Sequence, residues 1–250
     1  MINFGSPESV ENTRLSVMFK GPSGSGKTEA LMGFPGPIRL IYTDVNRETV
    51  RKAIQRGVKI EGTAVQTWSE FSDRIIPELV NRKFTGATIG LDTVDFLAAL
   101  MWKDIEGTRG KLTMQDFGTG LRRMGEATRA LVSLTLPYKD HPGYHVVFTS
   151  HLKDQTDDSG SLLKIGPALM GQFANQIEDY FDYVLLMQAE MVAKIEQVNG
   201  VTKSVPSKQF KIWSIPPDRY HTCKGGDMPA EMVVPNGGKA FELLNEWWKV

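Results

Sequence analysis

Residues 15–28 of the chain read LSVMFKGPSGSGKT. The first six, Leu15–Lys20, are a short apolar run of the kind that forms a β-strand, and the next eight, Gly21–Thr28, match the pattern G-x-x-x-x-G-K-[ST]. The residues that follow, EALMGF, are expected to be helical. A strand, a glycine-rich loop and a helix in this order are the context that this phosphate-binding motif requires.

The glycine-rich loop carries the groups that bind a chain of phosphates. Its glycines allow a tight curve in which backbone N–H groups point inward at phosphate oxygens. Lys27 is expected to reach the β- and γ-phosphates, and the Thr28 hydroxyl to ligate Mg²⁺. The alternative is a glycine-rich turn that only caps a helix. The predicted nucleotide-binding residues are Gly21, Ser23, Gly24, Ser25, Gly26, Lys27 and Thr28.

Beyond this loop, short β-rich runs alternate with longer amphipathic segments. Strands are expected at Leu15–Lys20, Ile38–Thr43, Thr88–Asp92, Tyr144–Thr149 and Tyr183–Met187, and helices at 47–56, 69–83 and 120–136. Such alternation predicts βαβ units, that is, an α/β fold with a mainly parallel sheet and helices on both faces.

The last part of the chain has a different pattern. Residues 191–197 and 207–215 are β-like and flank a turn at Asn199-Gly200, which predicts a β-hairpin added to the sheet edge. A final helix is expected over 239–248. We expect one domain that spans residues 1–250.

Two stretches lack an apolar period and are expected to be long loops. They are Lys103–Gly118 and Lys153–Gly166, both rich in Gly, Asp, Thr and Ser. Long loops in compact domains are often functional.

Composition narrows the classes of function. Lys plus Arg (29) equals Asp plus Glu (29), so the whole chain has no field that attracts polyanions, and any nucleic-acid contact must be local. No apolar run is long enough for a membrane span, and the first residues lack a secretory pattern, so we expect a cytoplasmic protein with no membrane partner. The single cysteine, Cys223, excludes an internal disulfide.

The run Thr88–Asp92 is an apolar strand that ends in an acid. A carboxylate at this place is expected to hold Mg²⁺ through water, opposite Thr28. The structural alternative is that Asp92 caps the helix that begins near Thr93.

A hydrolytic enzyme also needs a group that orients or deprotonates the attacking water. Asp44 and Glu48 follow the second strand and are candidates, while Asn46 could only orient a water. An N-cap with a first-turn acid explains these residues equally well. His151 follows the fourth strand and is a candidate sensor of the γ-phosphate. The alternative is that this histidine has only a structural role.

The order of these parts resembles a minimal RecA-like core, specifically the short phage-encoded RecA-like ATPases of the single-strand annealing and recombination type. The resemblance covers roughly residues 14–225. Gly21–Thr28 resembles the Walker A motif of that family, Asp92 its Walker B acid, and His151 its glutamine or histidine sensor. The two long loops fall where RecA proteins have their DNA-binding loops.

The resemblance implies ATP and Mg²⁺ as ligands, assembly into rings or filaments, and contact with single-stranded DNA. The DNA contacts that it implies are Arg109, Lys111 and Lys153, and Arg219 or Lys224 would reach the γ-phosphate of a neighbouring subunit. Lys203, Lys208 and Lys211 on the expected hairpin are interpreted as a solvated face.

The chain departs from the RecA pattern at the catalytic glutamate. Asn46 stands at its position, and Glu48 is displaced by two residues. The first hypothesis, which rests on the glycine-rich loop and the two long loops, is an ATPase coupled to single-stranded DNA. Its catalytic candidates are Lys27, Asp44, Glu48 and His151. The alternatives are a nucleotide-dependent assembly module with little hydrolysis, and a nucleotide kinase.

Overall fold

The computed structural model describes residues 14–43, 48–107, 110–157, 159–170, 172–198, 201–218, 221–234 and 240–248. Three predicted site residues, Asp44, Arg109 and Arg219, lie outside this part of the chain, as does Asn46.

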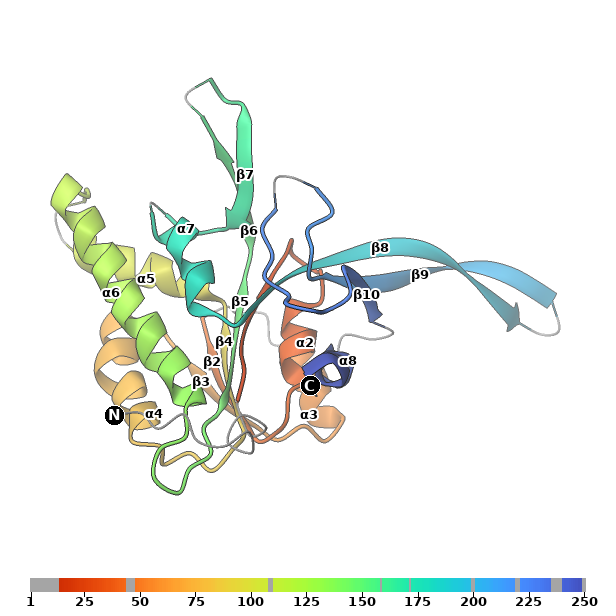
Figure 1. The fold of residues 1–250 in the computed structure, drawn as a ribbon, viewed down its shortest axis with the longest axis horizontal. Helices are drawn as coiled ribbons and strands as arrows, with labels where there is room; N and C mark the ends of the chain where they lie inside the picture. The colour runs from red at the N-terminus through yellow and green to blue at the C-terminus, as the bar shows by residue number, and fades with distance from the viewer. Residues whose placement is uncertain are drawn as a thin grey trace.

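An eight-stranded sheet forms the centre of the molecule, in the order β10-β9-β8-β1-β5-β4-β2-β3 (Figure 1). Its strands are β1 Ser16–Lys20, β2 Ile38–Tyr42, β3 Ile60–Ala64, β4 Thr88–Asp92, β5 His145–Ser150, β8 Tyr183–Val198, β9 Val201–Trp213 and β10 Glu231–Val234. All pairs from β8 to β3 are parallel, and β8–β9 and β9–β10 are antiparallel. The prediction of a mainly parallel α/β sheet with a hairpin at its edge is confirmed.

Helices cover both faces of this sheet. One face carries a π-helix (Glu70–Ile75) with α4 (Ile76–Val80), α5 (Val94–Glu106), α6 (Met114–Val132) and α7 (Phe173–Gln176). The other face carries α2 (Lys27–Met32), α3 (Glu48–Gln55) and α8 (Ala240–Trp248). Two short 3₁₀ helices, Ser133–Thr135 and Ile177–Tyr180, follow α6 and α7.

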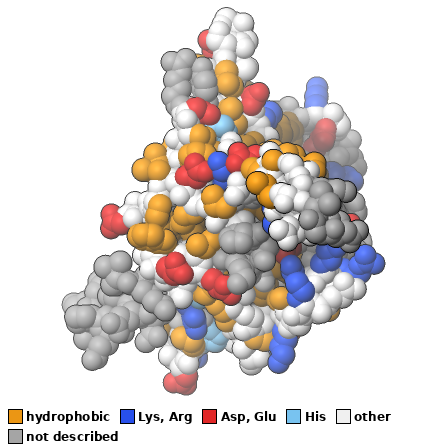
Figure 2. All heavy atoms as spheres, turned by 90° about the vertical axis from the view of Figure 1, so that its right-hand side faces the viewer, with side chains coloured by type: hydrophobic (Ala, Val, Ile, Leu, Met, Phe, Trp, Pro, Cys, Tyr) orange, Lys and Arg blue, Asp and Glu red, His pale blue; other side chains and the backbone are white. Residues whose placement is uncertain are grey.

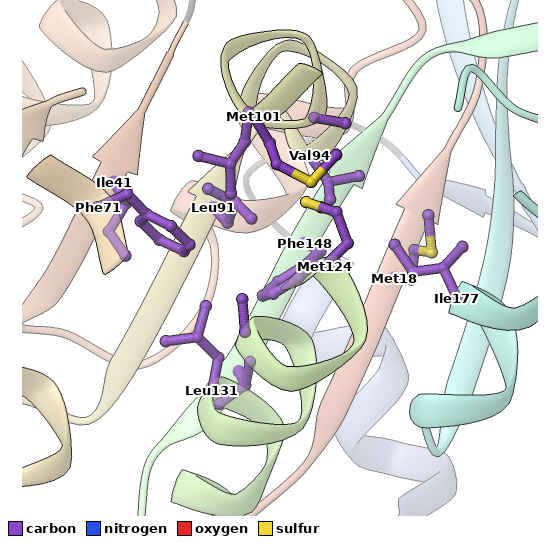
Figure 3. Close-up of a cluster of buried hydrophobic side chains, with 14 of the residues drawn as sticks. Met18, Ile41, Phe71, Leu91, Val94, Met101, Met124, Leu131, Phe148 and Ile177 are labelled. Carbon is purple, nitrogen blue, oxygen red and sulfur yellow. The ribbon is translucent and has the colours of Figure 1, made fainter. Parts of the chain in front are cut away.

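The alternation of side chains along the central strands explains why two layers of helices are needed. Met18 of β1 packs into the cluster under α5 and α6, whereas its neighbours Val17 and Phe19 pack under α2. Strands β2, β5 and β8 likewise contribute residues to both clusters, and such strands with two apolar faces are typical of parallel sheets. Figure 3 shows the first cluster, in which Phe148 of β5 lies beside Met124 of α6.

Two β-hairpins project from the body of the molecule (Figure 1). The arm formed by β8 and β9 continues well past the sheet, with Val198 paired to Val201 at its far end. The second hairpin joins β6 (Leu152–Thr156) to β7 (Leu162–Pro167). The expectation of a long loop over Lys153–Gly166 is therefore wrong, because the segment pairs with itself.

The expected loop over Lys103–Gly118 is also largely helical. Helix α5 runs through Glu106 and ends at Gly107, whose φ of 55° is one that glycine adopts readily. Helix α6 then begins with a capping box, in which Asp116 accepts hydrogen bonds from the backbone and hydroxyl of Thr113, both at 2.7 Å. Only a short connection remains between the two helices.

None of the helices in the described ranges combines the length and the apolar composition that a membrane crossing requires.

Candidate functional site

The glycine-rich loop connects β1 to α2 at the carboxyl edge of the sheet and borders a pocket of about 440 Å³. Lys27, Thr28, Asp92 and His151 all line this pocket, so the structure brings together four predicted residues from three different parts of the chain. Ser23, Gly24 and Gly26 contribute the loop's own wall. Crevices at the carboxyl ends of parallel strands are the usual ligand sites of this fold class.

Close packing against β8 and β9 explains two of the glycines. A Cβ atom at Gly21 would lie 2.3 Å from the carbonyl oxygen of Met187, and one at Gly26 would lie 2.8 Å from Cδ1 of Phe210. Gly26 also has φ 93°, a left-handed conformation, at the start of α2. A side chain at Gly21 would require the loop or the backbone of β8 to move, and one at Gly26 would require the Phe210 ring to move.

The side chain of Lys27 is buried and turned onto the loop. Its Nζ donates hydrogen bonds to the carbonyl oxygens of Gly21 (2.8 Å) and Pro22 (2.9 Å). Burial lowers the pKa of Lys27 from 10.5 to about 8, against the opposing influence of the Asp92 and Asp95 carboxylates. The ammonium group is thus poorly solvated where it stands, which favours an exchange of these carbonyls for phosphate oxygens.

Thr28 and Asp92 present oxygen atoms on one side of the pocket. The Thr28 hydroxyl donates to Oδ2 of Asp92 at 2.9 Å, and Thr149 of β5 donates to Oδ1 of the same carboxylate. The hydroxyl oxygen of Thr28 and the carboxylate of Asp92 are ligands that fit Mg²⁺. This ion prefers oxygen ligands and is commonly held by one or two protein groups, while phosphates and water supply its other ligands. Asp92 is buried at the end of β4, where β4 fixes its position.

His151 is held in place by an acid that the sequence reasoning did not identify. Its Nδ1 lies 2.8 Å from Oδ2 of Asp95, and its backbone N–H donates to Oδ1 of Asp95 at 3.0 Å. Burial would raise the pKa of Asp95, but the hydrogen bonds from the ring and backbone of His151 outweigh burial and lower it. The imidazole is therefore oriented from α5 toward the pocket that it lines.

The candidate water-activating acids are less well placed. Glu48 begins α3 and forms an ion pair with Lys52 at 2.8 Å, with 60% of each side chain exposed. Thr49 and Lys52 of the same helix line the pocket. The catalytic role of Glu48 stays a prediction, and Asp44 lies outside the described residues.

Three further predicted residues, Lys224, Lys111 and Lys153, are not among the described residues that line the pocket. Lys224 pairs with Val184 through its backbone, and its Nζ donates to the carbonyl of Phe181 at 2.6 Å. Lys111 is exposed between α5 and α6, and Lys153 is exposed on β6. Ser25 is buried, and its hydroxyl has no hydrogen-bond partner among the described residues.

Two residues of β9 enter the site although the sequence reasoning assigned them no role there. Lys208, interpreted as part of a solvated face, is exposed, yet its Nζ donates to the carbonyl of Gly24 at 2.5 Å. Phe210 also lines the pocket. Asp95 lies three residues after Asp92, in the first turn of α5, and this spacing could have drawn attention to it; β9 carries no comparable sequence signal.

Comparison with known proteins agrees with this geometry. The model of the family described as "AAA domain" matches residues 13–211. The chain belongs to this family. As an AAA domain, it is a P-loop nucleotide-binding protein, and the matched range contains the glycine-rich loop, Asp92 and His151.

Among solved structures, the AAA domain is similar to "Crystal structure of flagellar accessory protein FlaH from Methanocaldococcus jannaschii". The two share 9% sequence identity, with 90% of this chain and 88% of that chain covered and a TM-score of 0.44. A search of curated protein sequences returned no match.

Proposed function

We propose that this AAA domain binds ATP with Mg²⁺ at the glycine-rich loop and hydrolyses it, and that single-stranded DNA controls the reaction, as in recombination or annealing. The observation that carries the proposal is the convergence of Lys27, Thr28, Asp92 and His151 on one pocket at the carboxyl edge of the sheet. Each has the chemistry that phosphoryl transfer requires.

The residues have separate tasks in this proposal. Lys27 binds the terminal phosphates with its ammonium group, and Gly21 and Pro22 hold that group near the loop until the nucleotide enters. Thr28 and Asp92 would hold Mg²⁺, which neutralises charge that develops on the phosphate oxygens. His151, whose Nδ1 faces Asp95, is within the same pocket, and its Nε2 can accept a hydrogen bond from the attacking water or, in the imidazolium form, donate one to the terminal phosphate.

The proposed link to DNA runs through the hairpin of β6 and β7. Strand β6 begins at Leu152, directly after His151, and the N–H of Ala168 donates to the carbonyl of His151 at 2.8 Å. Both ends of the hairpin are therefore anchored at His151. A movement of His151 toward a bound phosphate would move the base of the hairpin, which carries Lys153.

The test is ATP turnover with and without single-stranded DNA, with the particle mass measured in parallel. We expect DNA to raise turnover or to change the mass from that of a single chain to that of a ring or filament. The variant Lys153→Glu should lose the DNA effect but keep basal turnover. Lys59→Glu is its control, because Lys59 is exposed just before β3, at the amino edge of the sheet.

If saturating single-stranded DNA changes neither turnover nor mass, the DNA half of the proposal is wrong. If Lys59→Glu loses the DNA effect to the same extent as Lys153→Glu, the loss reflects net charge alone, and the hairpin has no special role.

A nucleotide-dependent assembly module with little hydrolysis is the second candidate. The observation that favours it is the ion pair of Glu48 with Lys52, both well exposed, since it ties up the acid nearest the expected catalytic position. Turnover of the wild type and of Glu48→Ala separates the two. A negligible rate in both, with nucleotide-dependent mass, supports the module.

A further inference from the structure

Strand β9 forms a wall of the nucleotide pocket, and neither the family nor the glycine-rich motif accounts for it. Lys208 and Phe210 are two residues apart on this strand, so both side chains lie on the same face of the arm. Lys208 donates to the carbonyl of Gly24 at 2.5 Å, and Phe210 packs against Gly26. The Lys208 Nζ also lies 5.2 Å from the centre of the Phe210 ring. These contacts fix the ring against the loop.

The strand order shows which end of a nucleotide would meet this wall. Asp92 ends β4, which lies two strands from β1 on one side, and β9 lies two strands from β1 on the other. At about 4.8 Å per strand, the two walls are roughly 19 Å apart. With the terminal phosphates drawn to Lys27, Thr28 and Asp92, the nucleoside end extends away from β4, toward β9.

The chemistry of the two walls agrees with this direction. The β4 wall presents a carboxylate, a hydroxyl and an imidazole, which suit a metal ion and phosphates. Phe210 contributes the only phenyl, phenol or indole ring among the described residues that line the pocket. An aromatic ring beside a basic stem suits a nucleobase, because every base has a flat π-surface that stacks on aromatic side chains.

We propose that Phe210 is the base-contacting residue of this site and that Lys208 positions its ring against the glycine-rich loop. The inference rests on the proposed function, since it needs a nucleotide in the pocket. In this proposal, affinity for the nucleoside end of the nucleotide comes from the arm of β8 and β9. A bound nucleotide would then contact the arm and the glycine-rich loop at the same time.

A pair of probes separates the base from the phosphates. Binding of ATP and of inorganic tripolyphosphate, both with Mg²⁺, is measured by calorimetry for the wild type, Phe210→Leu and Phe210→Tyr. Leucine keeps an apolar contact with Gly26 but removes the aromatic surface, and tyrosine keeps the ring. The control variant is Met191→Ala, because Met191 is paired with Lys208 across the arm and is 67% exposed.

The expected result is a loss of ATP affinity of about tenfold in Phe210→Leu, with the affinity for tripolyphosphate unchanged, as removal of one base stack predicts. Phe210→Tyr and Met191→Ala should bind both probes like the wild type. Loss of both probes by the same factor in Phe210→Leu would mean that the ring only supports the loop, and that result overturns the inference.

Equal affinity of the wild type for ATP and tripolyphosphate would also overturn the inference, while leaving phosphate binding at the loop intact. Failure of the wild type to bind either probe would instead refute the proposed function itself. The two failures are therefore distinguishable in one set of titrations.

Discussion

The pKa of Lys27 predicts that nucleotide binding weakens with pH in a range where most lysines stay charged. In the free protein, burial lowers this pKa to about 8, so about 90% of the side chain is protonated at pH 7 and about 10% at pH 9. A bound triphosphate raises the pKa again, because opposite charge favours the ammonium form. Binding above pH 8 therefore takes up a proton, and affinity must fall as pH rises.

The size of the effect follows from these fractions. If only the protonated form binds, affinity drops about tenfold between pH 7 and pH 9, which corresponds to about 1.4 kcal/mol. The assay is calorimetric titration of MgATP at half-unit intervals of pH. The control is Lys27→Arg, which stays charged throughout, so that any titration of the nucleotide or of other groups appears in both proteins.

The informative quantity is the ratio of wild-type affinity to Lys27→Arg affinity. We expect this ratio to fall about tenfold across the range. A ratio that stays constant from pH 7 to pH 9 would show that Lys27 is either not the phosphate-binding cation or not desolvated in the free protein.

Three further predictions concern Asp92, Asp95 and the buried pair of Lys20 and Glu178. Asp92→Asn keeps the side-chain shape but removes the charge and one of the two acceptor oxygens, so it should raise the Mg²⁺ concentration needed for half-maximal ATP turnover; an unchanged Mg²⁺ titration would exclude Asp92 from the metal site. Asp95→Asn should lower turnover by roughly 10-fold or more with little effect on ATP affinity, since it frees the ring of His151; equal losses in both would indicate a general defect of the pocket. Glu178→Gln should lower the free energy of unfolding in urea by roughly 3 kcal/mol, because the carboxylate of Glu178 accepts a hydrogen bond at 2.5 Å from the ammonium group of Lys20, which is fully buried. A change below about 1 kcal/mol would show that the negative charge of Glu178 is not needed to keep Lys20 buried.

The parts of the fold that the sequence could predict are those whose cause is local. Residues 88–92 form the expected strand, and all five are buried in the sheet. A short, mainly apolar run of this kind is typical of a strand that is covered on both faces. The loop of Gly21–Thr28 likewise follows from residues that are adjacent in sequence. Its position after β1 and before α2 was predicted for that reason.

The two wrong loop predictions have a shared physical cause. Strands β6 and β7 project from the body of the molecule, so neither has one fully buried face. Strand β6 is largely polar, and β7 begins with two adjacent leucines, Leu162 and Leu163, so the period of two disappears from the sequence. The segment after Trp102 was predicted to be a loop because three of its first four residues are charged. These residues, Lys103, Asp104 and Glu106, lie in the last turns of α5. A charged last turn on an amphipathic helix gives no apolar signal, and only Gly107 marks its end.

The contacts that complete the site could not be predicted, because they join residues distant in sequence. Lys208 and Gly24 are separated by 184 positions, and nothing in either neighbourhood indicates the other. Composition was similarly uninformative at the arm. The face toward which the arm projects mixes acidic and basic side chains among hydrophobic ones (Figure 2), so no single charge points to a ligand there.

The central claim is that the loop of Gly21–Thr28 binds a nucleoside triphosphate through Lys27. Its most direct test is a titration of MgATP into the wild type and into Lys27→Ala at pH 7, with the unfolding transition of both proteins recorded. The account predicts one site per chain in the wild type and a loss of at least about 100-fold in the variant, which removes a buried charge-assisted contact, with the fold retained. Equal affinity of the two folded proteins would contradict it.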